Sequence, residues 1–158
     1  MLKHAKGNLL DLAEAGDFDI VVQGCNCFNT MGGGIAREIR ERYPHVAKVD
    51  ALTIRGDYNK LGTWTKENVL VKNGTVSFDI INAYTQYNMS TDEDVFEYVA
   101  FALILQKLEK AYSDKRIGLP YIGMGLAGGK KKVIIPMIEY FAQGISAKGG
   151  TVTLVEFG

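Results

Sequence analysis

The sequence DIVVQ at residues 19–23 leads directly into GCNCFNTMGGG at residues 24–34, and IAREIRER follows at residues 35–42. The first segment is short, apolar and rich in β-branched residues, as buried strands are. The third gathers its apolar residues on one face of a helical pattern. Pro44 should end that helix, because proline disfavours the α region in the residue before it. These residues therefore predict a strand, a glycine-rich loop and a helix in succession.

Strand and helix patterns alternate along the rest of the chain. Residues 68–72 and 75–81 flank Asn73 and Gly74, a pair that supplies the positive φ angles of a type I′ hairpin turn. The sequence STDE at residues 90–93 has the pattern of a capping box, and it precedes a helical segment that extends to about residue 113. We expect the apolar stripe of this helix to comprise Val95, Val99, Ala102, Leu103, Gln106 and Leu108.

A second glycine-rich loop, GMGLAGG at residues 123–129, follows a strand pattern at residues 116–122 that Pro120 interrupts. A helix from about residue 131 to 143 and a strand at residues 151–157 complete the chain. This order predicts an α/β fold, with helices on both faces of a mixed, mostly parallel sheet of about six strands. We find no repeat or linker, so residues 1–158 should form a single domain. Ligands bind such sheets beyond the carboxyl ends of the strands, where both glycine-rich loops should lie.

The composition is that of a soluble globular protein, with 47% apolar and 23% charged residues. Lysine and arginine number 18 and balance 18 acidic residues, so a broad electrostatic surface for nucleic acid is not expected. No apolar run reaches the ~20 residues that span a bilayer, and the first residues lack the apolar region of a signal peptide. We therefore expect a cytoplasmic monomer that does not associate with membranes.

The two cysteines, Cys25 and Cys27, are separated by one residue. Alternate side chains of an extended segment point to opposite faces, so we expect free thiols rather than a disulfide. No second cysteine pair completes a zinc site, and no metal is expected. The histidines, His4 and His45, are expected at the surface.

Three successive glycines at residues 32–34 exceed what a strand-to-helix turn needs. Glycine lets the backbone approach a ligand closely, and the free N–H groups of a helix's first turn form an anion site. The loop therefore indicates a diphosphate cradle, and the alternative is a tight turn that binds nothing. The second loop fits the dinucleotide fingerprint G-x-G-x-x-G, but it lies in the last strand–helix unit, and the acidic residue expected about 20 positions later is missing. We interpret it as a second phosphate loop that faces the first, rather than as a nicotinamide site.

Four segments, in this order, resemble the signature of macro domains: KGNLL at residues 6–10, VQGCNC at 22–27, MGGGIA at 31–36 and LPYIGMGLAGG at 119–129. The resemblance extends over nearly the whole chain. It implies a three-layer α/β/α macro domain that binds a small molecule, ADP-ribose or ADP-ribose 1″-phosphate, without a cofactor. The stretch from residue 25 to 44 resembles the branch that includes the yeast-type ADP-ribose 1″-phosphate phosphatases.

The resemblance also implies roles for residues by their position. Asn8, where the family usually has aspartate, and Leu9 would contact adenine, and Asn26 would lie near the distal ribose. Phe157 would stack on adenine, unless it is a terminal residue outside the site. The two phosphate loops would comprise Met31, Gly32, Gly33, Gly34 and Ile35, and Gly123, Met124, Gly125, Leu126, Ala127 and Gly128.

Catalytic candidates near the first loop are Asn26, Gln23 and Asn29, none of which titrates near neutral pH. We expect a slow phosphatase in which loop N–H groups stabilise the transferring phosphate and Asn26 holds the attacking water. Related hydrolases that use a covalent lysine mechanism have an aspartate where this chain has Ala127 and a lysine in the region of residues 83–88, which contain none. That mechanism is therefore disfavoured. Two alternatives stay open: a hydrolase that removes ADP-ribose from protein or nucleic acid, and a non-catalytic reader of ADP-ribose.

Overall fold

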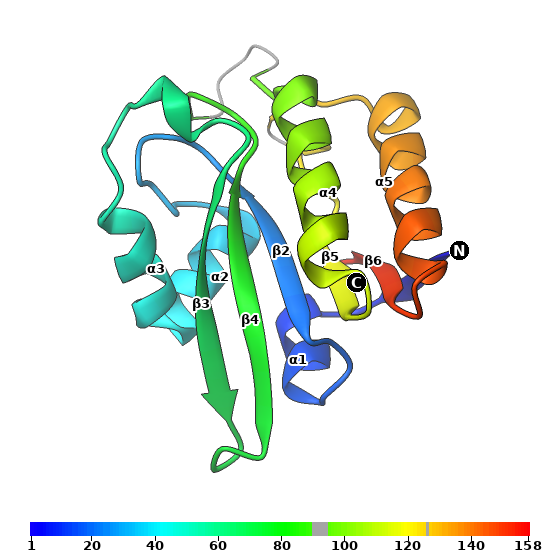
Figure 1. The fold of residues 1–158 in the computed structure, drawn as a ribbon. Coiled ribbons are helices and arrows are strands. Elements are labelled where there is room, and N and C mark those ends of the chain that lie inside the picture. The colour runs from blue at the N-terminus through cyan, green and yellow to red at the C-terminus, as the bar shows by residue number, and fades with distance from the viewer. Residues whose placement is uncertain (90–94, 126) are drawn as a thin grey trace.

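A computed structural model of the chain describes residues 1–89, 95–125 and 127–158. Its centre is a six-stranded sheet in the order β1-β6-β5-β2-β4-β3 (Figure 1). β3 and β4 run antiparallel, and the other neighbouring pairs are parallel, which confirms the predicted mixed sheet. The strands are β1 (Leu2–Lys6), β2 (Ile20–Cys25), β3 (Trp64–Val71), β4 (Val76–Tyr84), β5 (Arg116–Leu119) and β6 (Thr151–Glu156).

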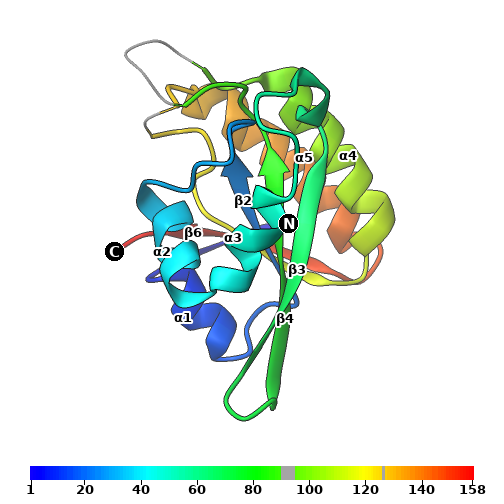
Figure 2. The same ribbon diagram turned by 90° about the vertical axis from the view of Figure 1, so that its left-hand side faces the viewer.

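Helices cover both faces of this sheet, so the predicted three-layer α/β/α architecture is confirmed. α4 (Tyr98–Tyr112) and α5 (Lys131–Ser146) pack on one face (Figure 1). The other face carries α1 (Leu9–Glu14), α2 (Gly34–Arg42) and α3 (Pro44–Ala51) (Figure 2). A short 3-10 helix, η1 (Tyr58–Lys60), precedes β3.

Each face of the sheet has its own apolar core, and β2 contributes to both. Val22 packs with the α4 and α5 residues Ile104 and Ile138, whereas Val21 packs with Ile39 of α2. This division follows from the alternation of side chains along a strand. β2 is thereby fixed from two sides, and so is the start of the loop that follows it.

Pro44 separates α2 from α3, as the sequence predicted for the end of α2. α2 ends at Arg42, and Pro44 is the first residue of α3, where its missing N–H costs nothing. Pro120 likewise follows the end of β5, which is shorter than the predicted strand at 116–122. Pro136 lies inside α5, which extends further than predicted, to Ser146.

The hairpin between β3 and β4 is confirmed, but its turn is longer than predicted. Val71 ends β3 and pairs with Val76, so four residues connect the strands. The N–H of Gly74 donates to the carbonyl of Val71 at 3.1 Å. The central residues of this turn are Lys72 and Asn73, with φ of 53° and 58°. The positive φ pair therefore lies one residue before the predicted Asn73–Gly74, and Gly74 follows with φ of 78°.

The prediction for α4 was wrong in two respects. Residues 95–97 are not helical, and Phe96 forms a bridge with Gln86, so the helix begins at Tyr98; the proposed capping box at 90–93 lies outside the described residues. Four members of the predicted stripe are exposed: Val99, at 76%, and Ala102, Leu103 and Gln106. The sequence is apolar on most sides of this helix, so its period left the buried face ambiguous. The residues that α4 buries are Ala100, Phe101, Ile104, Leu105 and Leu108.

No helix within the described ranges is long and apolar enough to cross a membrane.

Candidate functional site

The two glycine-rich loops meet at a cleft of about 640 Å³ beyond the carboxyl ends of β2, β4 and β5. β2 and β4 end at the top of Figure 1, opposite the turn that joins β3 to β4. Parallel strands end at the same edge of a sheet, and this edge is where ligands bind in α/β folds. The sequence-predicted residues that line the cleft are Asn26, Gly32, Gly33, Gly34, Ile35, Gly123, Gly125 and Ala127.

The first loop presents the beginning of α2 to the cleft. Gly33 is the N-cap of α2 and has no side chain to accept a hydrogen bond, so no side-chain cap occupies the N–H groups of the first turn. A Cβ atom added to Gly32 or Gly33 would meet nothing within 4 Å. Gly34 has φ of 57°, which favours glycine. Packing therefore does not explain Gly32 or Gly33, whose missing side chains leave open space.

The second loop turns tightly, and packing explains part of its glycine content. Gly123 has φ of 73°, and a Cβ there would lie 2.2 Å from Cδ1 of Phe96. The N–H of Gly129 donates to the carbonyl of Gly123 at 2.7 Å and closes the loop. At Gly125, in contrast, a Cβ would meet nothing within 4 Å. Gly125 thus resembles Gly32 and Gly33 in leaving open space at the cleft.

Gly24 and Thr85 form part of the cleft that the sequence did not reveal. A Cβ at Gly24 would lie 2.8 Å from Oγ1 of Thr85 and 2.9 Å from Cγ2 of Ile122. Thr85 is 1% exposed, and its Oγ1 has no hydrogen-bond partner within the described chain. Its N–H donates to the carbonyl of Cys25 at 3.1 Å, which ties the end of β4 to the end of β2. The other lining residues that sequence reasoning missed are Cys25, Thr30, Ala36, Gln86, Met89, Pro120, Tyr121 and Ile122.

Asn26 lines the cleft and also shapes the first loop. Its Oδ1 accepts from the N–H of Phe28 at 2.8 Å. Its Nδ2 donates to Oγ1 of Thr30 at 2.7 Å and to the carbonyl of Thr30 at 3.3 Å. A carbonyl oxygen has two lone pairs, so Oδ1 can accept one further hydrogen bond.

The structure does not bring the other two catalytic candidates to the cleft. Gln23 is fully buried, and its Nε2 donates to Oδ1 of Asn82 at 2.8 Å within the sheet. The amide of Asn29 is bonded to Thr53 and Lys60, on the segment between α3 and β3. Both side chains serve the fold around the loop, and neither is placed to touch a ligand in the cleft.

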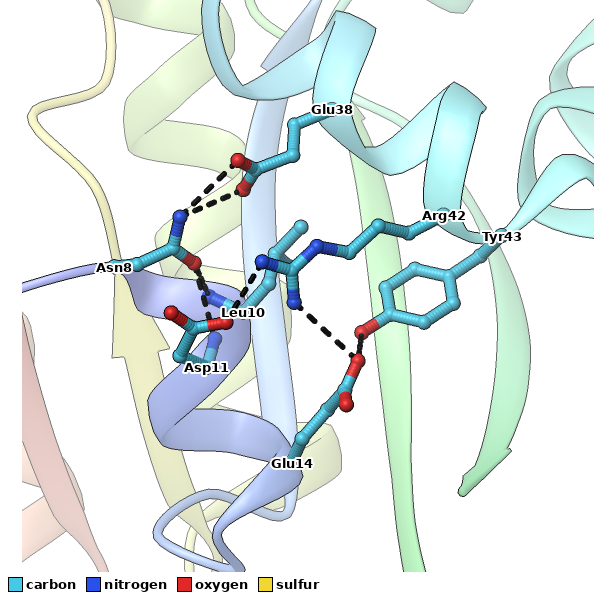
Figure 3. Close-up of polar contacts among 7 residues, drawn as sticks. All are labelled: Asn8, Leu10, Asp11, Glu14, Glu38, Arg42 and Tyr43. Atoms are coloured by element: carbon cyan, nitrogen blue, oxygen red, sulfur yellow. Dashed lines mark hydrogen bonds and ion pairs between the residues drawn. The ribbon is translucent and has the colours of Figure 1, made fainter. Parts of the chain in front are cut away.

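Asn8 and Leu9 also lie outside the cleft lining. Asn8 is the N-cap of α1: its Oδ1 accepts from the N–H groups of Leu10 and Asp11, at 2.9 and 3.0 Å. Its Nδ2 donates to both carboxylate oxygens of Glu38 in α2 (Figure 3). Leu9 is 4% exposed and packs in the core beneath α1 and α2.

The remaining predicted residues are dispersed around the loops. Met31 is buried in the α1–α3 core, and Met124 packs against the α4–α5 core. Gly128 has φ of 79° and is not among the cleft-lining residues. Phe157 follows β6 and is 82% exposed. Leu126 lies outside the described residues.

The electrostatics of the cleft come from backbone groups rather than charged side chains. The lining residues of the described chain include no aspartate, glutamate, histidine, lysine or arginine. Cys25 and Cys27 are free, as predicted, and both are buried. Burial raises the pKa of both thiols, that of Cys25 well above its usual range, so neither is a thiolate at neutral pH. His4 and His45 are exposed, as expected, and neither lines the cleft.

Comparisons with known proteins identify the fold. No protein-family model matches the chain. It is 29% identical over 147 residues to an uncharacterized 17.5 kDa protein from the tk-vs intergenic region of Enterobacteria phage T4, and the match covers 90% of each chain. The macrodomain of Mycobacterium tuberculosis DarG is similar with a TM-score of 0.76 and 18% identity, covering 98% of this chain and 97% of that one. The structure of Thermosipho africanus DarTG in complex with ADP-ribose is similar with a TM-score of 0.72 and 12% identity, covering 92% of this chain and 39% of that one. The chain therefore has the macrodomain fold.

Proposed function

We propose that this chain, which has the macrodomain fold, binds ADP-ribose in the cleft and slowly hydrolyses ADP-ribose 1″-phosphate to ADP-ribose and phosphate. One observation carries the binding proposal: Gly32, Gly33 and Gly125 face one cleft from two loops, with open space at each missing Cβ. The fold is shared with Thermosipho africanus DarTG, whose structure contains ADP-ribose.

The diphosphate is proposed to lie between the two loops. The first turn of α2 supplies free N–H donors and the positive end of a helix dipole. The second loop lines the same cleft at Gly123, Gly125 and Ala127 and is proposed to supply further backbone donors. Backbone donors of this kind bind an anion without a lysine or arginine in the cleft, which fits the uncharged lining of the described chain.

The two ends of the ligand are assigned from the neighbours of the loops. The distal ribose is proposed to lie by Asn26, Thr30 and Thr85, which all line the cleft. Adenine is proposed to extend beyond the cleft lining toward Asn8, Leu9 and Phe157, where Asn8 is joined to α2 through Glu38 and Phe157 is exposed.

In the proposed reaction, water attacks the phosphorus of the terminal phosphate and forms the new phosphorus–oxygen bond, while the bond from phosphorus to the C1″ oxygen of the ribose breaks. The attacking water loses a proton to solvent, and the released C1″ oxygen takes up a proton from solvent to give ADP-ribose and inorganic phosphate. The free lone pair of Asn26 Oδ1 accepts a hydrogen bond from this water and orients it. Loop N–H groups stabilise the charge on the transferring phosphate. No acid or base among the described lining residues assists the proton transfers, so turnover is slow.

The lack of an acid or base in the described cleft lining also favours a second candidate, a reader that binds ADP-ribose and does not hydrolyse it. A cleft without a carboxylate, histidine or lysine in its described lining offers binding groups without a proton donor or acceptor. A hydrolase with the lysine and aspartate mechanism is less favoured, because Ala127 stands at the aspartate position and is 6% exposed.

Calorimetric titration with ADP-ribose, beside a phosphate-release assay on ADP-ribose 1″-phosphate, tests these proposals. Micromolar binding with phosphate release is the expected result. Binding without release would favour the reader or a hydrolase that acts on another linkage. Absence of binding at millimolar ligand would contradict the ADP-ribose site altogether.

A further inference from the structure

Lys60, the last residue of η1, is a buried lysine with 7% of its surface exposed. Lysine is almost never fully buried unless it is paired, because removing the ammonium group from water is costly. None of the ion pairs within the described ranges includes Lys60. Its Nζ donates instead to Oδ1 of Asn29 at 2.7 Å and to Oγ1 of Thr53 at 3.0 Å, and it lies 5.3 Å from the centre of the Tyr84 ring. Neutral acceptors and an aromatic face thus contact this charge directly, and the charge also acts on the buried carboxyl of Asp50, where it opposes the rise in pKa that burial causes.

The contact with Asn29 ties Lys60 to the first loop. Asn29 has φ of 59°, a conformation that a residue other than glycine keeps when its surroundings hold it. Its Nδ2 donates to the carbonyl of Thr53 at 3.0 Å, and its Oδ1 accepts from Lys60. Both ends of the amide are therefore bonded to the segment between α3 and β3.

Asn29 lies between two residues that line the cleft, Asn26 and Thr30. The same loop is held at Cys27, whose carbonyl accepts from the N–H of Gly56 at 2.7 Å and whose N–H donates to the carbonyl of Tyr87 at 2.9 Å. One wall of the cleft is therefore fixed from behind by residues that do not line it.

The hydrogen bonds around Asn29 show what the ammonium group of Lys60 adds to the loop. Without Lys60, the hydroxyl of Thr53 would still lie 3.0 Å from Oδ1 of Asn29, but its one proton can instead be donated to the carbonyl of Asp50, which is 2.6 Å away. An unbranched apolar side chain could occupy the volume of the lysine stem. Removing the ammonium group would also leave the buried carboxyl of Asp50 without this nearby positive charge, so a loss of stability is expected beside the effect on the loop. What the ammonium group adds is a short bond to the loop.

We infer that Lys60 is a positioning residue that fixes, through Asn29, the segment carrying Asn26 and Thr30 into the cleft. Lys60 touches no ligand itself. Its effect on ADP-ribose affinity rests on the proposed function, whereas its effect on the loop does not.

Amide hydrogen exchange of the ligand-free protein tests the loop directly, with Lys60→Met as the variant. The amides of Cys27 and Phe28, bonded to Tyr87 and Asn26, should exchange about tenfold faster or more, while those of β4 keep their rates. Lys107→Met is the matched control, because Nζ of Lys107 donates to the carbonyl of Gly62 at 3.0 Å and does not contact Asn29. ADP-ribose affinity should fall about tenfold in Lys60→Met and stay unchanged in Lys107→Met.

Unchanged exchange at Cys27 and Phe28 in Lys60→Met would overturn the inference. Faster exchange throughout β4 as well would also overturn it, because that result indicates a general structural role. If Lys60→Met does not fold, Asn29→Gly replaces it. Glycine readily adopts the φ of Asn29, and Lys60 keeps its hydrogen bond to Thr53 in this variant. The same exchange measurements then decide the inference. A wild-type protein that does not bind ADP-ribose would contradict the proposed function, and the exchange rates would still decide the role of Lys60.

Discussion

The Nδ2 atom of Asn8 donates to both carboxylate oxygens of Glu38, at 3.0 and 3.1 Å, while the Oδ1 atom of Asn8 caps α1 (Figure 3). An aspartate at position 8 could form the cap equally well, but it would place a second carboxylate against Glu38. The amide of Asn8 is the group that satisfies both neighbours. Glu38 thus gives a physical reason for asparagine at a position where the macro domain resemblance implies aspartate.

Asn8→Asp should lower the free energy of unfolding at neutral pH by about 1 kcal/mol, because two half-buried carboxylates would face each other. Urea unfolding measures the effect. The double variant Asn8→Asp/Glu38→Gln should regain the wild-type value, because the glutamine amide can donate to the new carboxylate. Equal losses in the single and double variants would show that the pair does not determine the residue at position 8.

Glycine substitutions separate packing from ligand space. Gly32→Ala and Gly125→Ala should leave the urea midpoint nearly unchanged, because their Cβ atoms meet nothing within 4 Å. Both should weaken ADP-ribose binding about tenfold or more, because a methyl group would occupy space beside the proposed diphosphate. Calorimetric titration measures the affinity.

Gly24→Ala is the contrasting variant. Its Cβ would lie 2.8 Å from Oγ1 of Thr85, so the free energy of unfolding should fall by about 1–3 kcal/mol. Wild-type affinity in Gly32→Ala and Gly125→Ala would argue against a ligand between the two loops.

The catalytic proposal predicts different outcomes for two neighbouring residues. Asn26→Ala should reduce phosphate release from ADP-ribose 1″-phosphate about a hundredfold or more, because it removes the acceptor for the attacking water. Thr30→Val removes the hydroxyl that pairs with Nδ2 of Asn26 and keeps the Asn26 amide, so most turnover should remain. Full turnover in Asn26→Ala would contradict the proposed role, and equal losses in both variants would assign Asn26 to shaping the loop.

Asp19 and Arg116 join the beginnings of β2 and β5, and this pair should make stability depend on pH. Nε and an Nη atom of Arg116 donate to the two oxygens of Asp19, at 3.1 and 3.0 Å. The hydrogen bond from Arg116 lowers the pKa of the Asp19 carboxyl below its usual range, although partial burial opposes this. A carboxyl group with a lowered pKa in the folded state stabilises above its unfolded pKa of about 4 and loses that contribution as the pH falls further.

Asp19→Asn should therefore cost about 1 kcal/mol at pH 7, since the pair is partly exposed to solvent. The difference from wild type should shrink steadily as the pH falls below about 4. Urea unfolding across this range measures it, with the exposed Asp114→Asn as control. A loss that is the same at acidic and neutral pH would show that the ionised carboxylate does not contribute.

The sequence predicts best where its pattern is strong and local. β2, the first glycine loop and α2 were foreseen because a β-branched apolar run, three glycines and a helical period follow one another. β1, α1 and α3 escaped prediction. β1 is a half-exposed edge strand, and the two helices are too short for a period to show. α4 begins after Glu97, which supplies no side-chain cap, so no local signal marked its start.

The cleft could be predicted in outline and not in detail. The two loops could be predicted because glycine residues are visible in the sequence itself and indicate close approach of the backbone to a ligand. Thr85 carries no such signal: its significance comes from Gly24, which lies beside it across two paired strands. Lys60 and Asn29 are likewise distant in sequence, and their contact depends on the path of the chain between α3 and β3.

The most direct test of the two-loop cleft is an NMR titration of the ¹⁵N-labelled protein with ADP-ribose. Amide shifts should change at residues 32–36 and at residues 123–125 and 127–128 together, because one diphosphate is proposed to contact both loops. Shifts confined to one loop, or located elsewhere on the surface, would contradict the account.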